Sequence, residues 1–180
     1  MGLNKYIIPL VLAMMTLLSC SNDKSLQKYL VDKQDDDKFL KIDVATSLLQ
    51  SDDSSFTQEQ KDILETIKKV NVVAYKISNG DMTEYEAEKQ KLATIINQEK
   101  YKTLMKMGSN KQGATLKYLG EEDAIDEVIV FASDNEKGFA VFRLLGKDMR
   151  PDQMIKLMNS IDDGDIDVSK LSGIGELFDL

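Results

Sequence analysis

The sequence predicts a single α+β domain with the element order β-α-β-α-β-β-β-α. Two kinds of segment support this prediction: short runs rich in Val, Ile, Phe and Tyr, which are typical of strands, and longer runs whose apolar residues recur at helical spacing. Gly- and Asn-containing turns separate the later strand-like runs. Because these later strands have short connections, we expect a mostly antiparallel sheet, with the helices packed on one of its faces.

A strand, a helix and a second strand are expected first. Residues 39–44 are rich in strand formers and partly alternate. Thr57 and Gln60 have the spacing of a capping box, which predicts the start of a helix. This helix is amphipathic, and three apolar residues share one of its faces: Ile63, Leu64 and Ile67. Residues 70–77 form an apolar run closed by a Ser-Asn-Gly turn, which predicts the second strand.

A second helix is expected to run to about Gln98. Thr83 and Glu86 repeat the spacing of the capping box. Four apolar residues face the same way: Tyr85, Leu92, Ile95 and Ile96. The apolar residues of the next segment, 101–107, fit neither the helical nor the strand period. Both an extension of the helix and a further strand are compatible with this segment.

Three strand-like segments follow at residues 114–119, 126–132 and 139–145. The last two flank a turn that ends at Gly138, which suits a hairpin with a left-handed exit. Their nearly continuous apolar content predicts central, well-covered strands. Pro151 then occupies a position typical of the first helical residue, so a third helix should pack on the sheet. Its apolar residues at helical spacing are Met154, Ile155, Met158 and Ile161.

The chain divides into four segments. These are a signal peptide at 1–19, a lipidated tether at 20–37, the α+β domain at 38–161 and an acidic tail at 162–180. In the tether, a short helix capped by Ser25 and docked on the domain is compatible with the spacing of Leu26, Tyr29 and Leu30. The tail suits a further short docked helix through Leu171, Ile174 and Phe178, although two glycines weaken it.

The first residues have the three zones of a secretory signal: a cationic start ending at Lys5, an apolar run at 6–17 and a small-residue exit. The apolar run is shorter than the roughly 20 residues that a membrane-spanning helix needs. The tetrad at 17–20, Leu-Leu-Ser-Cys, resembles the lipobox of bacterial lipoproteins. We therefore expect cleavage between Ser19 and Cys20 and a lipid on the Cys20 thiol. The alternative is an ordinary leader that happens to contain a cysteine.

These observations also bear on location and partners. A lipid on Cys20 predicts a protein of the bacterial cell envelope that contacts a membrane through its N-terminus. In enteric bacteria, an Asp directly after the lipidated cysteine retains a lipoprotein in the inner membrane. Ser21 occupies this position, so by analogy the outer membrane is favoured. The protein could face the periplasm or the cell surface. The net charge of −8 at pH 7 argues against a nucleic-acid partner.

Familiar catalytic machinery is missing from the sequence. The chain contains no histidine and one cysteine, which the lipid would occupy. Ser-His-Asp and Cys-His catalysis and imidazole metal sites are therefore excluded. No glycine-rich loop of the phosphate-binding or dinucleotide-binding type is present. We predict no catalytic residue, no metal and no cofactor.

Two groups of acidic residues suggest acid-based alternatives. Three alternating acids begin like a calcium loop: Asp163, Asp165 and Asp167. However, Val168 and Ile174 occupy the positions where that loop needs Gly and an acidic residue. Five further acids offer carboxylate pairs for glycoside cleavage: Glu121, Glu122, Asp123, Asp126 and Glu127. However, the chain has no Trp on which a sugar could stack. Both sets are also compatible with solvated turns.

A locally basic stretch lies near Tyr101 and Tyr118. It contains five lysines against one acid: Lys100, Lys102, Lys106, Lys111 and Lys117. Such a stretch suits contact with anionic lipid headgroups, and it equally suits a solvated face of scattered lysines. Four methionines are expected to fill the core: Met105, Met107, Met154 and Met158.

Three stretches of the sequence resemble a known family. They are SLQKYLVDKQDDDKFLKIDV, TEYEAEKQKLATIINQEKYKTLM and QGATLKYLGEEDAIDEVIVFASDNEKGFAVFRLLG, which together lie within residues 25–161. The family is that of bacterial lipoproteins containing the domain of unknown function 4252. The resemblance implies an α+β domain on a lipid tether in a Gram-negative envelope, and it implies no catalytic residue, cofactor or substrate.

From the sequence we expect a lipid-anchored envelope protein of unassigned activity, acting as a non-catalytic binding, structural or regulatory module. An envelope protein is a candidate partner. The alternative is a carboxylate-dependent envelope hydrolase, which would need a pocket holding two carboxylates with opposed pKa shifts.

Overall fold

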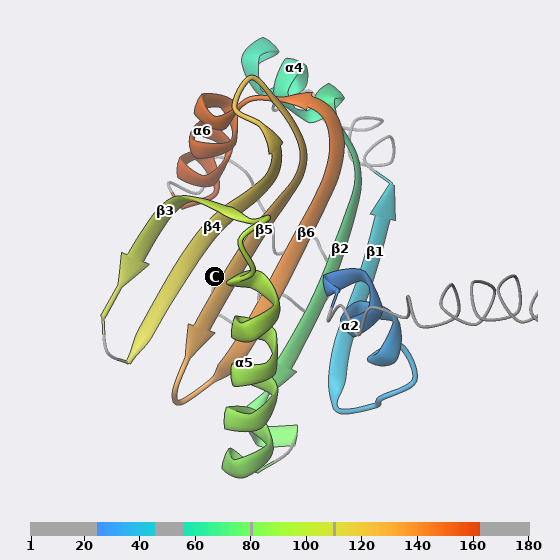
Figure 1. Ribbon diagram of the computed structural model, residues 1–180, viewed down its shortest axis with the longest axis vertical. Coiled ribbons are helices and arrows are strands. Elements are labelled where there is room, and N and C mark those ends of the chain that lie inside the picture. Colours follow the sequence, from blue (N-terminus) through green and yellow to red (C-terminus); the bar gives the residue numbers. More distant parts are fainter. Residues whose placement is uncertain (1–24, 46–55, 80, 110, 163–180) are drawn as a thin grey trace, which may run out of the picture.

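The computed structural model describes residues 25–45, 56–79, 81–109 and 111–162. Within this part, a six-stranded sheet is flanked by four helices (Figure 1). Two predicted features lie outside the described residues. They are the signal peptide with its cleavage site at Ser19 and Cys20, and the acidic tail with its three alternating aspartates. This is a single α+β domain, as the sequence predicts.

The sheet is antiparallel throughout, with the strand order β1-β2-β6-β5-β4-β3. The strands are β1 (Phe39–Ala45), β2 (Ile67–Lys76), β3 (Lys102–Gly108), β4 (Gln112–Glu121), β5 (Ala124–Asp134) and β6 (Gly138–Met149). As predicted, β5 and β6 are the central pair and form a hairpin. Gly138, where β6 begins, has φ +144, and a Cβ there would lie 1.9 Å from the carbonyl oxygen of Tyr75.

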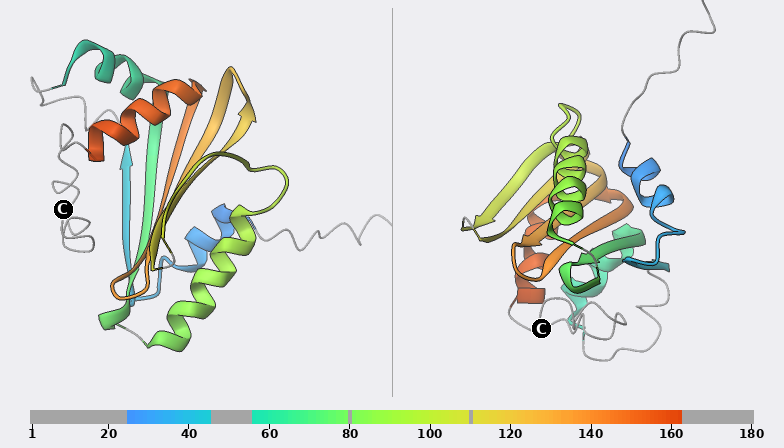
Figure 2. Two further views of the ribbon diagram at one scale, coloured as in Figure 1. Left: turned by 90° about the vertical axis from the view of Figure 1, so that its left-hand side faces the viewer. Right: turned by 90° about the horizontal axis from the view of Figure 1, so that it is seen from below.

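The helices cover both faces of the sheet, so the expectation that they pack on one face is wrong. Figure 2 shows one pair on each side. The pair α2 (Leu26–Asp32) and α5 (Met82–Ile96) covers one face, and the pair α4 (Gln58–Thr66) and α6 (Pro151–Asp162) covers the other. The reason is visible in β5, where consecutive apolar side chains point to opposite faces and each face must be covered.

Two hydrophobic cores result, one on each side of the sheet. Ile129 and Phe131 of β5 pack with α2 and α5, whereas Val128 and Val130 pack with α4 and α6. An aromatic cluster fills the first core, and its rings of Tyr75 and Phe139 are stacked 5.7 Å apart. The other rings of this cluster are Phe39, Tyr85 and Phe131.

Several local predictions are confirmed. The capping box of Thr57 and Gln60 opens α4, and Pro151 is the first residue of α6. The four apolar residues predicted on one face of the second helix are buried in the first core: Tyr85, Leu92, Ile95 and Ile96. Of the four methionines expected in the core, Met154 is buried and Met105 and Met158 are partly buried. The expectation is wrong for Met107, which is half exposed.

Two local expectations are settled differently. Residues 101–107, for which helix and strand were both open, lie mainly in β3, so four strands follow α5 rather than three. The predicted cap at Thr83 is wrong: α5 begins at Met82, and the Asp81 side chain accepts a hydrogen bond from the Glu84 amide. Asp81 lies two residues before Thr83 and is itself a strongly preferred capping residue. The helix therefore begins directly after Asp81.

The short helix that Ser25 and its apolar neighbours suggest is α2. Ser25 caps it, and three of its residues are buried in the first core: Leu26, Tyr29 and Leu30. Lys33, just beyond the helix, forms an ion pair with Glu88 of α5, with 2.9 Å between Nζ and Oε1. Part of the stretch predicted to be tether is therefore packed into the domain.

Candidate functional site

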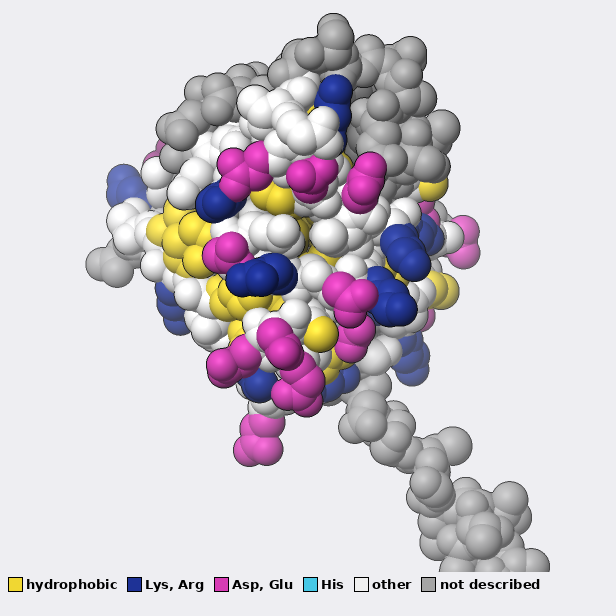
Figure 3. All heavy atoms as spheres, turned by 90° about the horizontal axis from the view of Figure 1, so that it is seen from above, with side chains coloured by type: hydrophobic (Ala, Val, Ile, Leu, Met, Phe, Trp, Pro, Cys, Tyr) yellow, Lys and Arg dark blue, Asp and Glu magenta, His cyan; other side chains and the backbone are white. Residues whose placement is uncertain are grey.

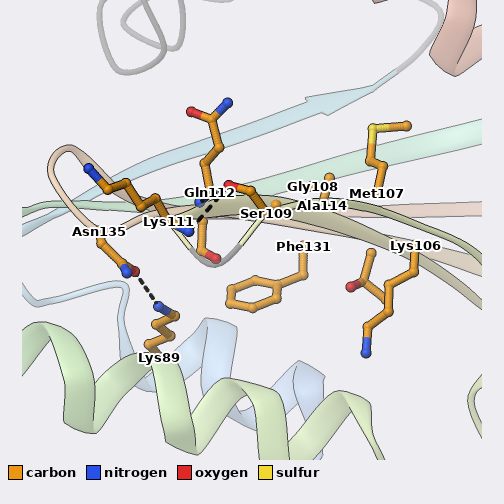
Figure 4. Close-up of a pocket in the computed structure, with 13 residues that line it drawn as sticks. Lys89, Lys106, Met107, Gly108, Ser109, Lys111, Gln112, Ala114, Phe131 and Asn135 are labelled. Carbon is orange, nitrogen blue, oxygen red and sulfur yellow. Dashed lines mark hydrogen bonds between the residues drawn. The ribbon is translucent and has the colours of Figure 1, made fainter.

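A groove lies between α5 and the β3–β4 hairpin. Its volume is about 390 Å³. We call it the lysine groove; it is lined by residues 106–109 and 111–115 of the hairpin, together with Lys89, Phe131, Ser133 and Asn135. Figure 4 shows Lys89 of α5 and Lys106 of β3 directed into the space between the helix and the sheet, with Phe131 between them.

Small residues make this end of the sheet hollow. Gly108 and Gly113 face each other across the β3–β4 ladder, and Ser133 follows in the same cross-strand row. Gly108 has φ +124, and a Cβ at this position would lie 2.4 Å from the carbonyl oxygen of Gln112. Glycine is therefore required for the turn, and its missing side chain leaves space beside α5.

The next cross-strand row supplies the walls of the groove. Lys106 pairs with Thr115, and Thr115 pairs with Phe131 on the following strand. Residues paired in this way point to the same face of an antiparallel sheet, so an ammonium group, a hydroxyl group and an aromatic ring lie side by side. Met107 points to the opposite face (Figure 4), which agrees with strand alternation.

The helix side of the groove is held in place by hydrogen bonds. Lys89 Nζ donates to Asn135 Oδ1 at 2.8 Å and lies 5.0 Å from the ring centre of Tyr85. The Tyr85 hydroxyl in turn donates to the backbone carbonyl of Asp134 at 3.0 Å. The position of Lys89 is thus fixed by the β5–β6 turn.

The groove is cationic. Its described lining includes Lys89, Lys106 and Lys111 and no Asp or Glu. Lys111 Nζ lies 3.9 Å from Glu136 Oε1, with both side chains more than 80% exposed. An ion pair so exposed contributes little. By contrast, acidic and basic side chains are interspersed at the end of the molecule that holds α4 (Figure 3).

Lys117 adds a further positive charge on the same face of β4, two residues beyond Thr115. It is only 7% exposed, and no carboxylate of the described residues pairs with it. Burial lowers the pKa of the Lys117 ammonium, and the charge of Lys106 lowers this pKa further. An anion bound nearby would relieve both effects.

The basic stretch expected from the sequence is thus only partly gathered into one site. Lys106 and Lys111 line the lysine groove, and Lys117 lies next to it. Lys102 instead lies 5.6 Å over the Tyr118 ring, which packs in the second core, and Lys100 lies 5.2 Å over Tyr101. Lys89 was not among the residues singled out from the sequence, although it follows the buried Tyr85 by one helical turn.

The acids considered for glycoside cleavage do not form a pair in a pocket. Four of them are exposed in or near the β4–β5 turn: Glu121, Glu122, Asp123 and Asp126. Glu127 is buried and accepts two hydrogen bonds from Arg143, at 3.0 Å to Oε1 and 3.1 Å to Oε2. Among the described residues, no group of three His, Cys, Asp or Glu side chains could hold a metal ion.

The Glu127–Arg143 pair lies at the centre of a polar cluster that links α2 to the sheet. Arg143 Nη1 also donates to Gln27 Oε1 of α2. Burial, and after it the charge of Glu127, raises the pKa of Tyr101 to about 12. This cluster has all its charges paired, so its role is structural.

A family model matches residues 29–157, from within α2 to within α6, and is described as a domain of unknown function (DUF4252). The chain belongs to the DUF4252 family. The DUF4252 match thus contains the complete sheet and the lysine groove. No curated protein and no solved structure matches the chain. In the described part of this DUF4252 protein, none of the helices has the length and apolar character needed to cross a bilayer.

Proposed function

We propose that this DUF4252 protein is a lipid-anchored envelope protein that acts as a non-catalytic binding module, with the lysine groove as the site for an anionic ligand. The anionic ligand is supported by one observation: Lys89 of α5 and Lys106 of β3 both point into the groove (Figure 4), and no carboxylate of the described residues lines it. Gathering like charges is unfavourable unless a counter-charge binds.

The alternative, a carboxylate-dependent hydrolase, lacks this kind of support. Such an enzyme needs two carboxylates facing one pocket. The second pocket of the described part, beside α2, is lined by Asp43 as its one carboxylate and has a volume of only about 70 Å³. Binding therefore accounts for the described surface better than hydrolysis does.

Anion binding is tested with the mature chain, residues 20–180, carrying Cys20→Ser so that no lipid is attached. We expect multivalent anions to raise the midpoint of thermal unfolding, because a ligand that binds only the folded state stabilises it. Lys106→Gln and Lys89→Gln should each weaken binding about tenfold, since a charge-assisted hydrogen bond contributes about 1.5 kcal/mol. Lys68→Gln, an exposed lysine of β2, is the matched control.

The lipid anchor needs a separate experiment. Cys20 follows a lipobox-like tetrad, and we propose that it carries the lipid and that the outer membrane holds it. Cys20→Ser should abolish incorporation of labelled palmitate and leave the precursor uncleaved. Continued labelling of the variant would refute the anchor, and separation of inner and outer membranes on a density gradient would show which one holds the protein.

A further inference from the structure

The charges of the lysine groove are arranged on two walls. Lys89 comes from α5 and Lys106 from β3, and both point into the intervening space (Figure 4). A ligand between them would receive hydrogen bonds from different directions. Phosphate accepts in this way because its oxygens are distributed around a tetrahedral centre, whereas a planar carboxylate is matched best by the planar fork of arginine. No arginine is among the described residues that line the groove.

Hydroxyl groups complement the two ammonium groups. Thr115 lies directly across the β3–β4 ladder from Lys106, and Ser133 lies one row further along the same face. Hydroxyl donors accompany lysine at many phosphate sites, where they bind oxygens that the ammonium groups do not reach. These two side chains place neutral donors on the sheet side of the groove, on the same face as Lys106.

The buried Lys117 favours a ligand of high charge density. This side chain is 7% exposed and lies on the same face of β4 as Thr115, the partner of Lys106, two residues further along the strand. A phosphate monoester carries about −1.5 to −2 charges at pH 7, against −1 for a carboxylate. The monoester therefore offers more negative charge to Lys106, and to Lys117 next to the groove, than a carboxylate does.

The size and the apolar part of the groove point to an organic phosphate. A volume of about 390 Å³ lies in the range of sites for small organic ligands, which runs from about 300 Å³ upward. Phe131 supplies an apolar surface beside the polar donors. The ligand thus has room for a carbon skeleton attached to its charged group.

We propose that the lysine groove binds a phosphate monoester through Lys89, Lys106 and Thr115. This inference rests on the proposed function, since it names the class of anion that the same site takes. The phosphate monoester is supplied either by a lipid headgroup that ends in one, as phosphatidic acid does, or by a soluble ester, and both sources present the same chemistry to the groove.

The test compares two ligands of similar carbon skeleton, glycerol 3-phosphate and glycerate, by isothermal titration calorimetry with the mature Cys20→Ser chain. We expect glycerol 3-phosphate to bind at least about tenfold more tightly than glycerate. Lys106→Gln and Lys89→Gln should each weaken its binding about tenfold, and Thr115→Val several-fold. Lys68→Gln should leave it unchanged. A change in the phosphorus NMR chemical shift of the ester on binding would show that its phosphate group contacts the protein.

Vesicles that contain phosphatidic acid, whose headgroup is a phosphate monoester, and vesicles of phosphatidylcholine alone separate the two sources. If the protein co-sediments with the vesicles that carry the anionic lipid, and Lys106→Gln abolishes this co-sedimentation, the ligand is a headgroup. If the protein binds the soluble ester and neither kind of vesicle, the ligand is a free ester. Tighter binding of glycerate than of the ester overturns the phosphate inference and leaves the anion-binding function standing. If none of these ligands binds, the inference and the proposed function both fail, and circular dichroism confirms that each variant is folded.

Discussion

Glu127→Gln should lower the free energy of unfolding by about 3 kcal/mol. The side chains of Arg143 and Glu127 are 11% and 7% exposed, and two hydrogen bonds of 3.0 and 3.1 Å join them. Removing one partner of a buried ion pair costs about 3–5 kcal/mol, because the other charge stays buried without compensation. We take the lower end because glutamine keeps the shape and one acceptor oxygen, and because Gln27 still accepts from Arg143.

The measurement is urea unfolding of the mature Cys20→Ser chain at pH 7, followed by circular dichroism. A double variant, Glu127→Leu with Arg143→Met, serves as the control. Since apolar residues of similar volume replace both charges, its stability should lie within about 1 kcal/mol of the parent. A loss below about 0.5 kcal/mol in Glu127→Gln would refute the reasoning, because it would mean that water already solvates this pair.

Three further outcomes follow from the described contacts. Asp81→Ala should cost about 1 kcal/mol in urea unfolding because it removes the cap of α5, whereas Thr83→Ala should cost nothing; the reverse result would restore the cap at Thr83. Gly138→Ala should cost at least about 2 kcal/mol, since φ is +144 there, and an unchanged midpoint would contradict the hairpin geometry. The lowered pKa of Lys117 means that the unfolded chain binds more protons than the folded one as pH approaches 10.5 from below, so stability should rise with pH in that window. Lys117→Met should flatten this rise, and an equal rise in the variant would assign it to another group.

The local part of the fold is largely present in the sequence. Gly138 marks the central hairpin, Thr57 and Gln60 mark the start of α4, and Pro151 marks the start of α6. Each of these signals acts through the backbone of its own residue or of residues within one helical turn. That is why they can be recognised without knowledge of the tertiary structure.

Other elements depend on contacts with residues that are distant in the sequence. The register of β3 shifts between Thr103 and Met105, so a bulge interrupts the period of two by which a strand is recognised. The two-sided covering of the sheet depends on which helix meets which face. Short-range periodicity shows that a helix has an apolar side, and it does not specify the surface that this side contacts.

The lysine groove could be predicted only in part for the same reason. Lys106 and Lys111 belong to a basic stretch that is evident in the sequence. Lys89 joins them because α5 crosses the sheet beside β4 and because Asn135 fixes its ammonium group. Both contacts join residues more than ten positions apart along the chain, and such pairings are set by the complete fold.

The docking of α2 determines how far the protein reaches from its membrane. Because Ser25 caps α2, only residues 21–24 separate Cys20 from this docked helix. Even fully extended, the steps from Cys20 to Ser25 span roughly 17 Å at about 3.5 Å each, and the single strand β6 is roughly 40 Å long at about 3.3 Å for each residue. With the proposed lipid on Cys20, the domain would stay against the headgroups and search for its ligand by lateral diffusion, in two dimensions.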